Sequence, residues 1–299
     1  MSVRALRPLR AHLFTDAPAA RLAMLRILTA AWTLQYVGRR RRLFAQVART
    51  DPSLFQPVGP MRALRRPLSP TSFRLLYGTT LAATVALLGG FRHRCSGPLF
   101  GGSLLCLLCY RNSWSMIYHN DNALVLHALT LAVSPSADAW SLDARSRADS
   151  RHDDADWRYG WPIQLMKAVT ALTYFLAGVA KVKGPLGLAW ASGDALRSQV
   201  AVDALRKELL GSTAAPLGAR LYERVAIYRA LAVGSLALEL GAPLALVNGR
   251  LARFWAMNAF LMHWGIYFVM GIRFRYQLAG VMFASYFEPE QAVRRIARR

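Results

Sequence analysis

The chain has 299 residues, of which 54% are hydrophobic and 18% are charged, and its formal net charge is +22 at pH 7. A mean hydropathy of +0.22 is too apolar for an ordinary soluble domain. Such a charge in a soluble protein would indicate nucleic acid as the partner. Here the arginines lie mainly at the ends of apolar runs, so we expect the lipid bilayer as the partner and no nucleic acid.

Long apolar runs divide the chain into candidate membrane spans, because a hydrocarbon core about 30 Å thick needs roughly 20 apolar helical residues. The long runs are Ala20 to Val37, Phe73 to Gly90, Trp161 to Val182, Val225 to Val247 and Phe254 to Gly271. The shorter or more interrupted candidates, which predict shorter spans, re-entrant pieces or helices buried by neighbours, are Pro98 to Ile117, Ala123 to Val133 and Tyr276 to Phe287. Strand-like alternation is absent from these runs. We therefore predict an all-α, polytopic helical membrane protein with about six to eight transmembrane helices in one bundle.

Arginine clusters flank these runs. Arg39 to Arg42 follow the first run, and Arg62, Arg65 and Arg66 lie later in the same loop. The positive-inside rule gives no orientation, because the segments on both sides of the first run are basic. The four arginines that end the first run favour a retained span over a secretory signal.

The domain organisation predicted from the runs is simple. They extend from end to end, so we expect a single transmembrane domain over residues 1–299 without a large extramembrane C-terminal domain. In the polar connection from 183 to 224, Leu196 to Leu210 are in helical phase, which predicts an interfacial amphipathic helix. The abundance of alanine and arginine is typical of GC-rich bacterial genomes and favours a multi-pass protein of the bacterial inner membrane.

One polar stripe lies within the run that starts at Trp161. Lys167, Ala171, Tyr174, Gly178 and Lys181 follow the spacing of a single helix face. Ionisable groups inside spans are costly and usually face a bundle interior or a cavity. A buried lysine loses its proton readily, whereas arginine stays charged, so Lys181 is a candidate base. The alternative is that Lys181 extends to the lipid headgroups from the end of its span.

Three further places carry polar groups near or within apolar runs. His119, Asn120 and Asp121 precede a run that contains His127, and this segment predicts either a helix cap or the mouth of a polar pocket.

Glu239 lies far from either end of its run, which indicates a neutral carboxyl, a carboxyl paired with a cation of another helix, or a catalytic group. His263 predicts an interhelical hydrogen bond or a ligand. No spacing supports a metal site. We expect Lys181, Glu239, His263 and the segment 120–127 to surround one intramembrane cavity.

Four segments in this order resemble the horizontally transferred transmembrane (HTTM) domain, which vitamin K-dependent gamma-carboxylases share with bacterial relatives. The segments are Trp140 to Asp143 after Ser134-Pro135, Trp161-Pro162 leading to Tyr174 to Lys181, Leu238 to Pro243, and His263 followed by Gly271 to Phe274. Arg26 in the first run also fits. Together they cover most of the chain.

The resemblance implies a chemistry. In the carboxylases, a lysine that resembles Lys181 is the proposed base that deprotonates reduced vitamin K. The quinol then reacts with oxygen, and the resulting strong base takes a proton from a glutamate side chain, which adds carbon dioxide. By this resemblance the chain is a gamma-carboxylase-like lyase or epoxidase that uses reduced vitamin K or another quinol and acts on a small peptide or protein. Its candidate catalytic residues are Lys181, His263 and His119. Its candidate substrate-binding residues are Asn120, Asp121, His127, Tyr174 and Glu239.

Two departures from the carboxylases keep a second hypothesis open. The carboxylases have a paired lysine where this chain has Ala180 before Lys181. We also expect this chain to be without the large extramembrane region that helps the carboxylases engage substrates. The alternative is a non-enzymatic membrane factor for the maturation or export of a small peptide, a role that the resemblance also implies for some bacterial members.

Overall fold

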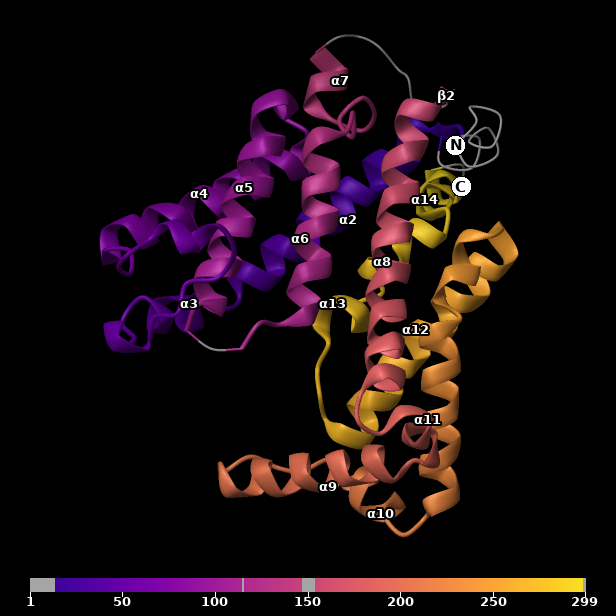
Figure 1. Cartoon of the computed structure of the whole chain (residues 1–299). Helices are drawn as coiled ribbons and strands as arrows, with labels where there is room; N and C mark the ends of the chain where they lie inside the picture. The colour runs from indigo at the N-terminus through magenta and orange to yellow at the C-terminus, as the bar shows by residue number, and fades with distance from the viewer. Residues whose placement is uncertain (1–13, 115, 147–153, 298–299) are drawn as a thin grey trace, which may run out of the picture. The chain divides into compact units, whose positions relative to one another are not determined.

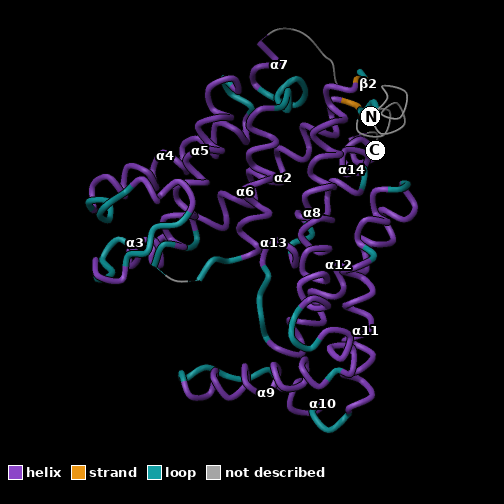
Figure 2. Tube along the Cα trace, viewed as in Figure 1, coloured by secondary structure: helices purple, strands orange, loops and turns teal. Residues whose placement is uncertain are grey.

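The computed structural model describes residues 14–114, 116–146 and 154–297, and the regular secondary structure within them is helical apart from one pair of two-residue strands (Figures 1 and 2). The all-α prediction is therefore confirmed. The chain divides into two compact units, one formed by Met1–Met166 with Glu288–Arg299 and the other by Lys167–Phe287. The single domain over residues 1–299 stays a prediction.

In its described part, the first unit contains the long helices α2, α4, α5 and α6, the start of α8 and several short elements. The helices are α2 (Ala19–Gly38), α3 (Arg41–Val47), α4 (Pro70–Gly89), α5 (His93–Asn112), α6 (His119–Val133), α7 (Leu142–Ser146), the start of α8 (Trp157–Lys183) and α14 (Pro289–Ala297), with the 3-10 turns η1 (Pro52–Leu54) and η2 (Gly59–Ala63). The strands β1 (Ala17–Pro18) and β2 (Ala155–Asp156) pair antiparallel, with Ala17 opposite Asp156.

Helix α4 shows how local sequence sets the boundaries of an element in this unit. The hydroxyl of Ser69 accepts a hydrogen bond from the Ser72 amide at 3.1 Å, and Pro70 occupies the first turn, where no amide donor is needed. Gly90 ends the helix in the left-handed conformation, with φ +61°. Helices α2, α4, α5 and α6 then pack side by side around the core of the unit.

The second unit is built around the C-terminal part of α8. Its other elements are η3 (Gly187–Ser192), α9 (Asp194–Leu209), α10 (Pro216–Leu221), α11 (Val225–Leu240), η4 (Ala242–Leu246), α12 (Gly249–Met270), α13 (Arg275–Leu278) and η5 (Val281–Tyr286). Within this unit α9 runs crosswise to α8 and α11 (Figure 1). The helix predicted around Leu196 to Leu210 is therefore present as α9.

Two of the described helices are long and apolar enough to cross a membrane. They are α4, with a mean hydropathy of 1.2 in its best window, and α8, with 1.4. Length and composition of two helices are modest support for a membrane protein, because a buried core helix can meet the same criteria. The predicted bundle of six to eight crossings is not confirmed.

Two apolar runs fold differently from the spans predicted for them. The run from Val225 to Val247 breaks after Leu240, because Pro243 lacks the amide donor that a continuing helix needs. At about 1.5 Å per residue, α11 is then shorter than a hydrocarbon core. The shorter candidate from Tyr276 to Phe287 forms only α13 and η5, with Gly280 between them at φ +74°, so no continuous helix covers this run.

Candidate functional site

The polar stripe predicted on α8 is the face that this helix buries in the second unit. Ala171, Tyr174 and Gly178 are buried, and Lys181 is half-buried one turn later. The neighbouring Leu172 and Leu176 are exposed. The helical spacing of small and polar residues therefore predicted the packed side of α8.

Lys181 forms an ion pair with Glu239 of α11. Its Nζ donates to both carboxylate oxygens at 2.5 Å, and it also lies 4.7 Å from the centre of the Trp190 ring. The Glu239 side chain is 8% exposed and that of Lys181 27%, so the carboxylate is the more enclosed partner. Of the alternatives for Glu239, pairing with a cation of another helix is the one the structure shows. Lys181 is turned toward this partner.

Gly178 allows α8 and α11 to come close enough for this pair. A Cβ atom at Gly178 would lie 2.9 Å from Cβ of Glu239 and 3.1 Å from the backbone nitrogen of Leu240. Both distances are shorter than ordinary van der Waals contact. The glycine of the Tyr174 to Lys181 segment therefore sets the separation across which Lys181 reaches Glu239.

Tyr174 and His263 form a second buried pair. The Tyr174 hydroxyl and His263 Nε2 are 2.6 Å apart, and Phe274 contacts the histidine ring edge-on at a centroid distance of 4.9 Å. The prediction of an interhelical hydrogen bond by His263 is confirmed. His263 Nδ1 is buried and has no hydrogen-bond partner among the described residues. It is one polar atom at this site that a ligand can still satisfy.

A groove of 530 Å³ lies between α11 and α12 of the same unit. Its wall is mainly apolar, with Ser235 and Asn258 as polar side chains. Trp255 belongs to this wall and also packs edge-on against Tyr174, with 5.1 Å between the ring centroids. The groove has the volume of a small-molecule site and shares one side chain with the Tyr174 to His263 pair.

The remaining candidates lie in the first unit. Asp121 is buried and bonded to Arg111 and Tyr36, and His127 Nε2 lies 3.1 Å from the carbonyl oxygen of Met166. His119 and Asn120 begin α6, and their side chains lie outside the described residues. A common cavity for these residues and the residues of the second unit stays a prediction.

Helix α6 is not capped by Asp121. The residue at its N-cap is Tyr118, whose side chain makes no capping hydrogen bond, and Asp121 lies in the first turn. The capping alternative for Asp121 is therefore wrong. Its carboxylate compensates a buried arginine instead.

That arginine, Arg111, is a polar residue that sequence reasoning missed. It donates to the Tyr36 hydroxyl and to Asn112 Oδ1 at 3.1 Å each, in addition to Asp121. The available signal was an arginine inside the apolar run from Pro98 to Ile117, where an unpaired cation would be costly. The run predicted a helix, but nothing in it indicated Tyr36 as a partner.

The first family-like segment has a structural role. Arg26 is fully buried and donates to the carbonyl oxygens of Ser136 and Trp140 at 2.6 Å each. Asp143 accepts hydrogen bonds from the backbone amides of Arg92 and His93 at 2.7 and 2.8 Å, and so satisfies donors at the start of α5. The Trp140 to Asp143 segment therefore stabilises the first unit.

Residues 174–181 and the last two family-like segments meet in the second unit. Tyr174 and Lys181 come from one segment, Glu239 from the next, and His263 with Phe274 from the last. Among the residues that the structure describes, no group of three His, Cys, Asp or Glu side chains is placed to hold a metal ion. What the site offers is proton exchange: a lysine and carboxylate pair and a tyrosine and histidine pair, next to aromatic rings.

Comparison with known proteins identifies the family of the chain. A family model described as HTTM domain matches residues 14–288, nearly the whole chain. No curated protein and no solved structure matches the chain. The match to the family model extends over both units and includes all four segments. The chain therefore belongs to the HTTM domain family.

Proposed function

We propose that this chain is an integral membrane enzyme that uses reduced vitamin K or another quinol. The HTTM domain is associated with vitamin K-dependent carboxylase-like membrane proteins. The observation that carries the proposal is the Lys181 to Glu239 ion pair on the same face of α8 as the Tyr174 to His263 pair. The proposed location is the inner membrane of a bacterium.

The residues at the site fit an aromatic ligand with ring hydroxyls. His263 Nδ1 is a buried polar atom without a partner among the described residues, so it can bond such a hydroxyl. Trp190, Trp255 and Phe274 supply apolar ring surface around the two polar pairs. When bound, the quinol would supply an acidic hydroxyl and reducing equivalents.

The Lys181 to Glu239 pair is the proposed proton acceptor. A protonated Lys181 that donates to both oxygens of Glu239 has no lone pair, so the carboxylate is the basic member in that state. If the shared proton moves to Glu239, the neutral lysine becomes the base. In both states the pair can take up one proton. The proposal thus assigns the base to the pair, with Lys181 as one member.

The test is quinol turnover by the purified full-length chain in lipid vesicles. Reduced vitamin K is supplied, and its oxidation and epoxidation are followed, together with any quinone that co-purifies. We expect Lys181→Met and Glu239→Gln each to lower turnover by about 100-fold or more, the usual contribution of a positioned base. Lys183→Met is the matched control, because Lys183 is exposed two residues away and should keep full turnover.

The enzymatic proposal is overturned by two results. One is turnover that is unchanged in Lys181→Met while the protein inserts and folds normally. The other is a wild-type chain that neither holds a quinone nor oxidises the quinol under conditions in which its helix content is intact.

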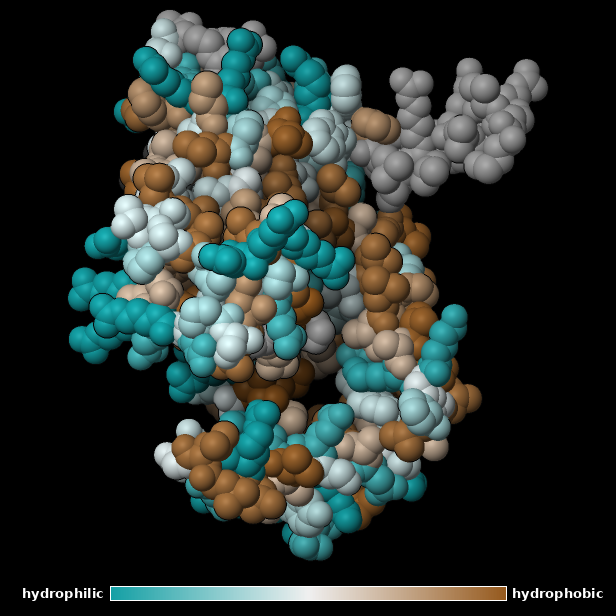
Figure 3. Space-filling view, turned by 60° about the vertical axis from the view of Figure 1, so that its left-hand side comes forward, coloured by the Kyte–Doolittle hydropathy of each residue, from teal (hydrophilic) through white to brown (hydrophobic). Residues whose placement is uncertain are grey.

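A second candidate function is a non-enzymatic factor for the maturation or export of a small peptide. One observation favours it: Val202, Leu205 and Leu209 form an apolar stripe on α9 and are 65%, 59% and 77% exposed. By helical spacing they face away from the buried Val200 and Asp203. Figure 3 shows apolar side chains at the lower end of the view, where α9 and α10 lie. An amphipathic peptide could pack against such a stripe.

This candidate predicts a different pattern of variants. Leu205→Asp combined with Leu209→Asp should stop maturation or export of the peptide, whereas Lys181→Met should leave it unchanged. Secretion of the peptide, measured in cells that carry each variant, distinguishes the two functions. Loss of secretion in Lys181→Met alone would favour the enzyme.

A further inference from the structure

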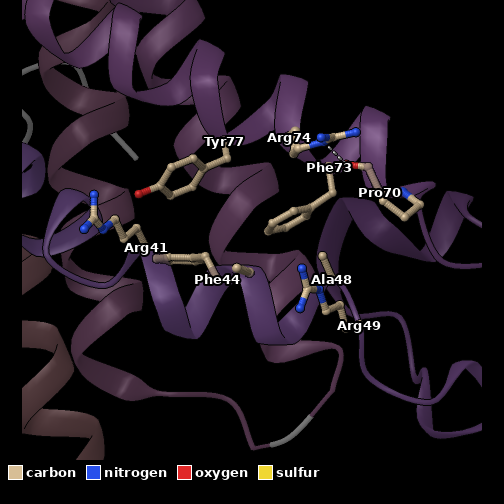
Figure 4. A pocket seen from close by; sticks show the side chains of 9 residues that line it. Arg41, Phe44, Ala48, Arg49, Pro70, Phe73, Arg74 and Tyr77 are labelled. Carbon is tan, nitrogen blue, oxygen red and sulfur yellow. Dashed lines mark hydrogen bonds between the residues drawn. The ribbon is translucent and has the colours of Figure 1, made fainter.

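A basic pocket in the first unit lies outside the site described above. It has a volume of 340 Å³ and is formed by α3, the turn after it and the first two turns of α4. Figure 4 shows Phe44, Phe73 and Tyr77 at its centre, with Arg41 on the side of the tyrosine hydroxyl and Arg49 beside Ala48. A third arginine, Arg74, lies on the side of Pro70. The pocket therefore combines an aromatic floor with a cationic rim.

The charge of the rim is not compensated from within the described part of the chain. Arg41, Arg49 and Arg74 are exposed, and none makes an ion pair with a described residue. Arg74 donates hydrogen bonds to the Pro70 carbonyl and the Thr71 hydroxyl, each at 3.3 Å. Both acceptors are uncharged, so they do not compensate the charge of the guanidinium. Three guanidinium groups around one cavity repel one another, so an anion in the cavity is stabilised by all three.

The floor of the pocket indicates that the anionic group of the ligand is joined to an apolar body. Phe44 and Phe73 are buried beneath the rim, and Ala45 and Ala48 also contribute apolar wall. Ala45, Ala48 and Tyr77 keep part of their apolar surface open to the pocket, and a free phosphate would leave that surface in contact with water. An anion with an apolar body covers the surface and keeps its charge at the rim.

The place of the pocket in the fold agrees with a lipid. Pro70 is the first residue of α4, one of the two helices that are long and apolar enough to span a bilayer. The end of a span lies at the depth of the headgroups, where basic residues contact lipid phosphates. We propose that this pocket binds one anionic phospholipid, with its phosphate between Arg41, Arg49 and Arg74 and its acyl chains against the apolar wall of Ala45, Ala48 and Tyr77.

The test measures phospholipid retained by the full-length chain. The protein is reconstituted in phosphatidylcholine with or without phosphatidylglycerol, extracted in mild detergent and analysed by native mass spectrometry. Arg41→Gln with Arg49→Gln should lower the retained phosphatidylglycerol by about tenfold or more, because each lost charged hydrogen bond is worth roughly a factor of ten. Arg65→Gln with Arg66→Gln is the control that removes the same charge from exposed positions outside the pocket. It should change retention by less than about twofold.

A third variant tests the apolar floor separately from the charge. Ala48→Phe fills the cavity and leaves all arginines in place, so it should also lower retention about tenfold. Ala45→Phe replaces it if the melting temperature in phosphatidylcholine shows that Ala48→Phe does not fold. Equal loss in both arginine pairs overturns the proposal in favour of general surface charge. Displacement of the lipid by an equal concentration of inorganic phosphate, or full retention in the filled-cavity variant, overturns it in favour of a free anion.

Discussion

The two units each bury an ion pair between helices, and the pairs differ in how completely they are enclosed. Arg111 and Asp121 of the first unit have side chains that are 6% and 1% exposed, and the arginine has further partners in Tyr36 and Asn112. In the second unit Lys181 is 27% exposed. An arginine held by several partners keeps its charge, whereas a partly accessible lysine can exchange a proton. This difference in enclosure suits the first pair to a stabilising role and the second to the proposed proton exchange.

Removal of Arg111 should cause the largest loss of stability. Arg111→Met leaves the Asp121 carboxylate buried without its cation, and breaking a buried pair in this way costs about 4 kcal/mol of unfolding free energy. Unfolding in detergent, followed by circular dichroism, measures the loss.

The double variant Arg111→Met with Asp121→Asn is the control, because it removes both charges and should recover a large part of the lost stability. If the single variant is as stable as the wild type, the pair contributes nothing to the first unit and the contrast between the units is lost.

Gly178 should give the next largest effect. Gly178→Ala brings a methyl group within 2.9 Å of Glu239 Cβ and 3.1 Å of a backbone nitrogen, so α8 and α11 must separate at a cost of about 2 kcal/mol. The melting temperature and the rate of quinol turnover should both fall.

Gly234→Ala is the matched control on α11. A Cβ at Gly234 meets no atom within 4 Å, so the alanine should stabilise the helix by up to about 1 kcal/mol. Equal melting temperatures for the two variants would show that the close approach at Gly178 does not hold the site together.

The sequence predicted the composition of the second site better than that of the first. Lys181, Tyr174 and Gly178 lie on one helix at helical spacing, so periodicity alone placed them on one face. The pairing of Lys181 with Glu239 joins residues 58 positions apart, and spacing carries no information about such a contact. The family resemblance identified both segments but not the bond between them.

The spans were predicted less well, for a physical reason. A hydropathy average counts apolar residues, but it carries no information about where a helix ends. Val225 to Val247 was expected to span, yet Pro243 ends the helical pattern, and Gly280 divides Tyr276 to Phe287. The apolar residues after Leu240, and most of those from Tyr276 to Phe287, therefore lie in turns and short helices.

Tyr174 should have a smaller effect on stability than Gly178 and a distinct effect on chemistry. Tyr174→Phe keeps the ring packed against Trp255 and removes the hydroxyl that contacts His263 Nε2, which should cost about 1.5 kcal/mol. Because the histidine then has both ring nitrogens free, the pH profile of quinol turnover should shift. An unchanged profile with the same loss of stability would make the Tyr174 to His263 pair purely structural.

Replacement of Lys181 should have the smallest effect on the free energy of unfolding, although its proposed effect on activity is the largest. Its side chain is 27% exposed, so water already screens part of its attraction to Glu239, and Lys181→Met should cost about 1 kcal/mol. The double variant Lys181→Met with Glu239→Gln removes the remaining charge and should unfold at nearly the wild-type temperature. A loss near that of Arg111→Met would place Lys181 among the residues that hold the fold together. A small loss of stability with abolished turnover is the result expected of a group that is retained for chemistry.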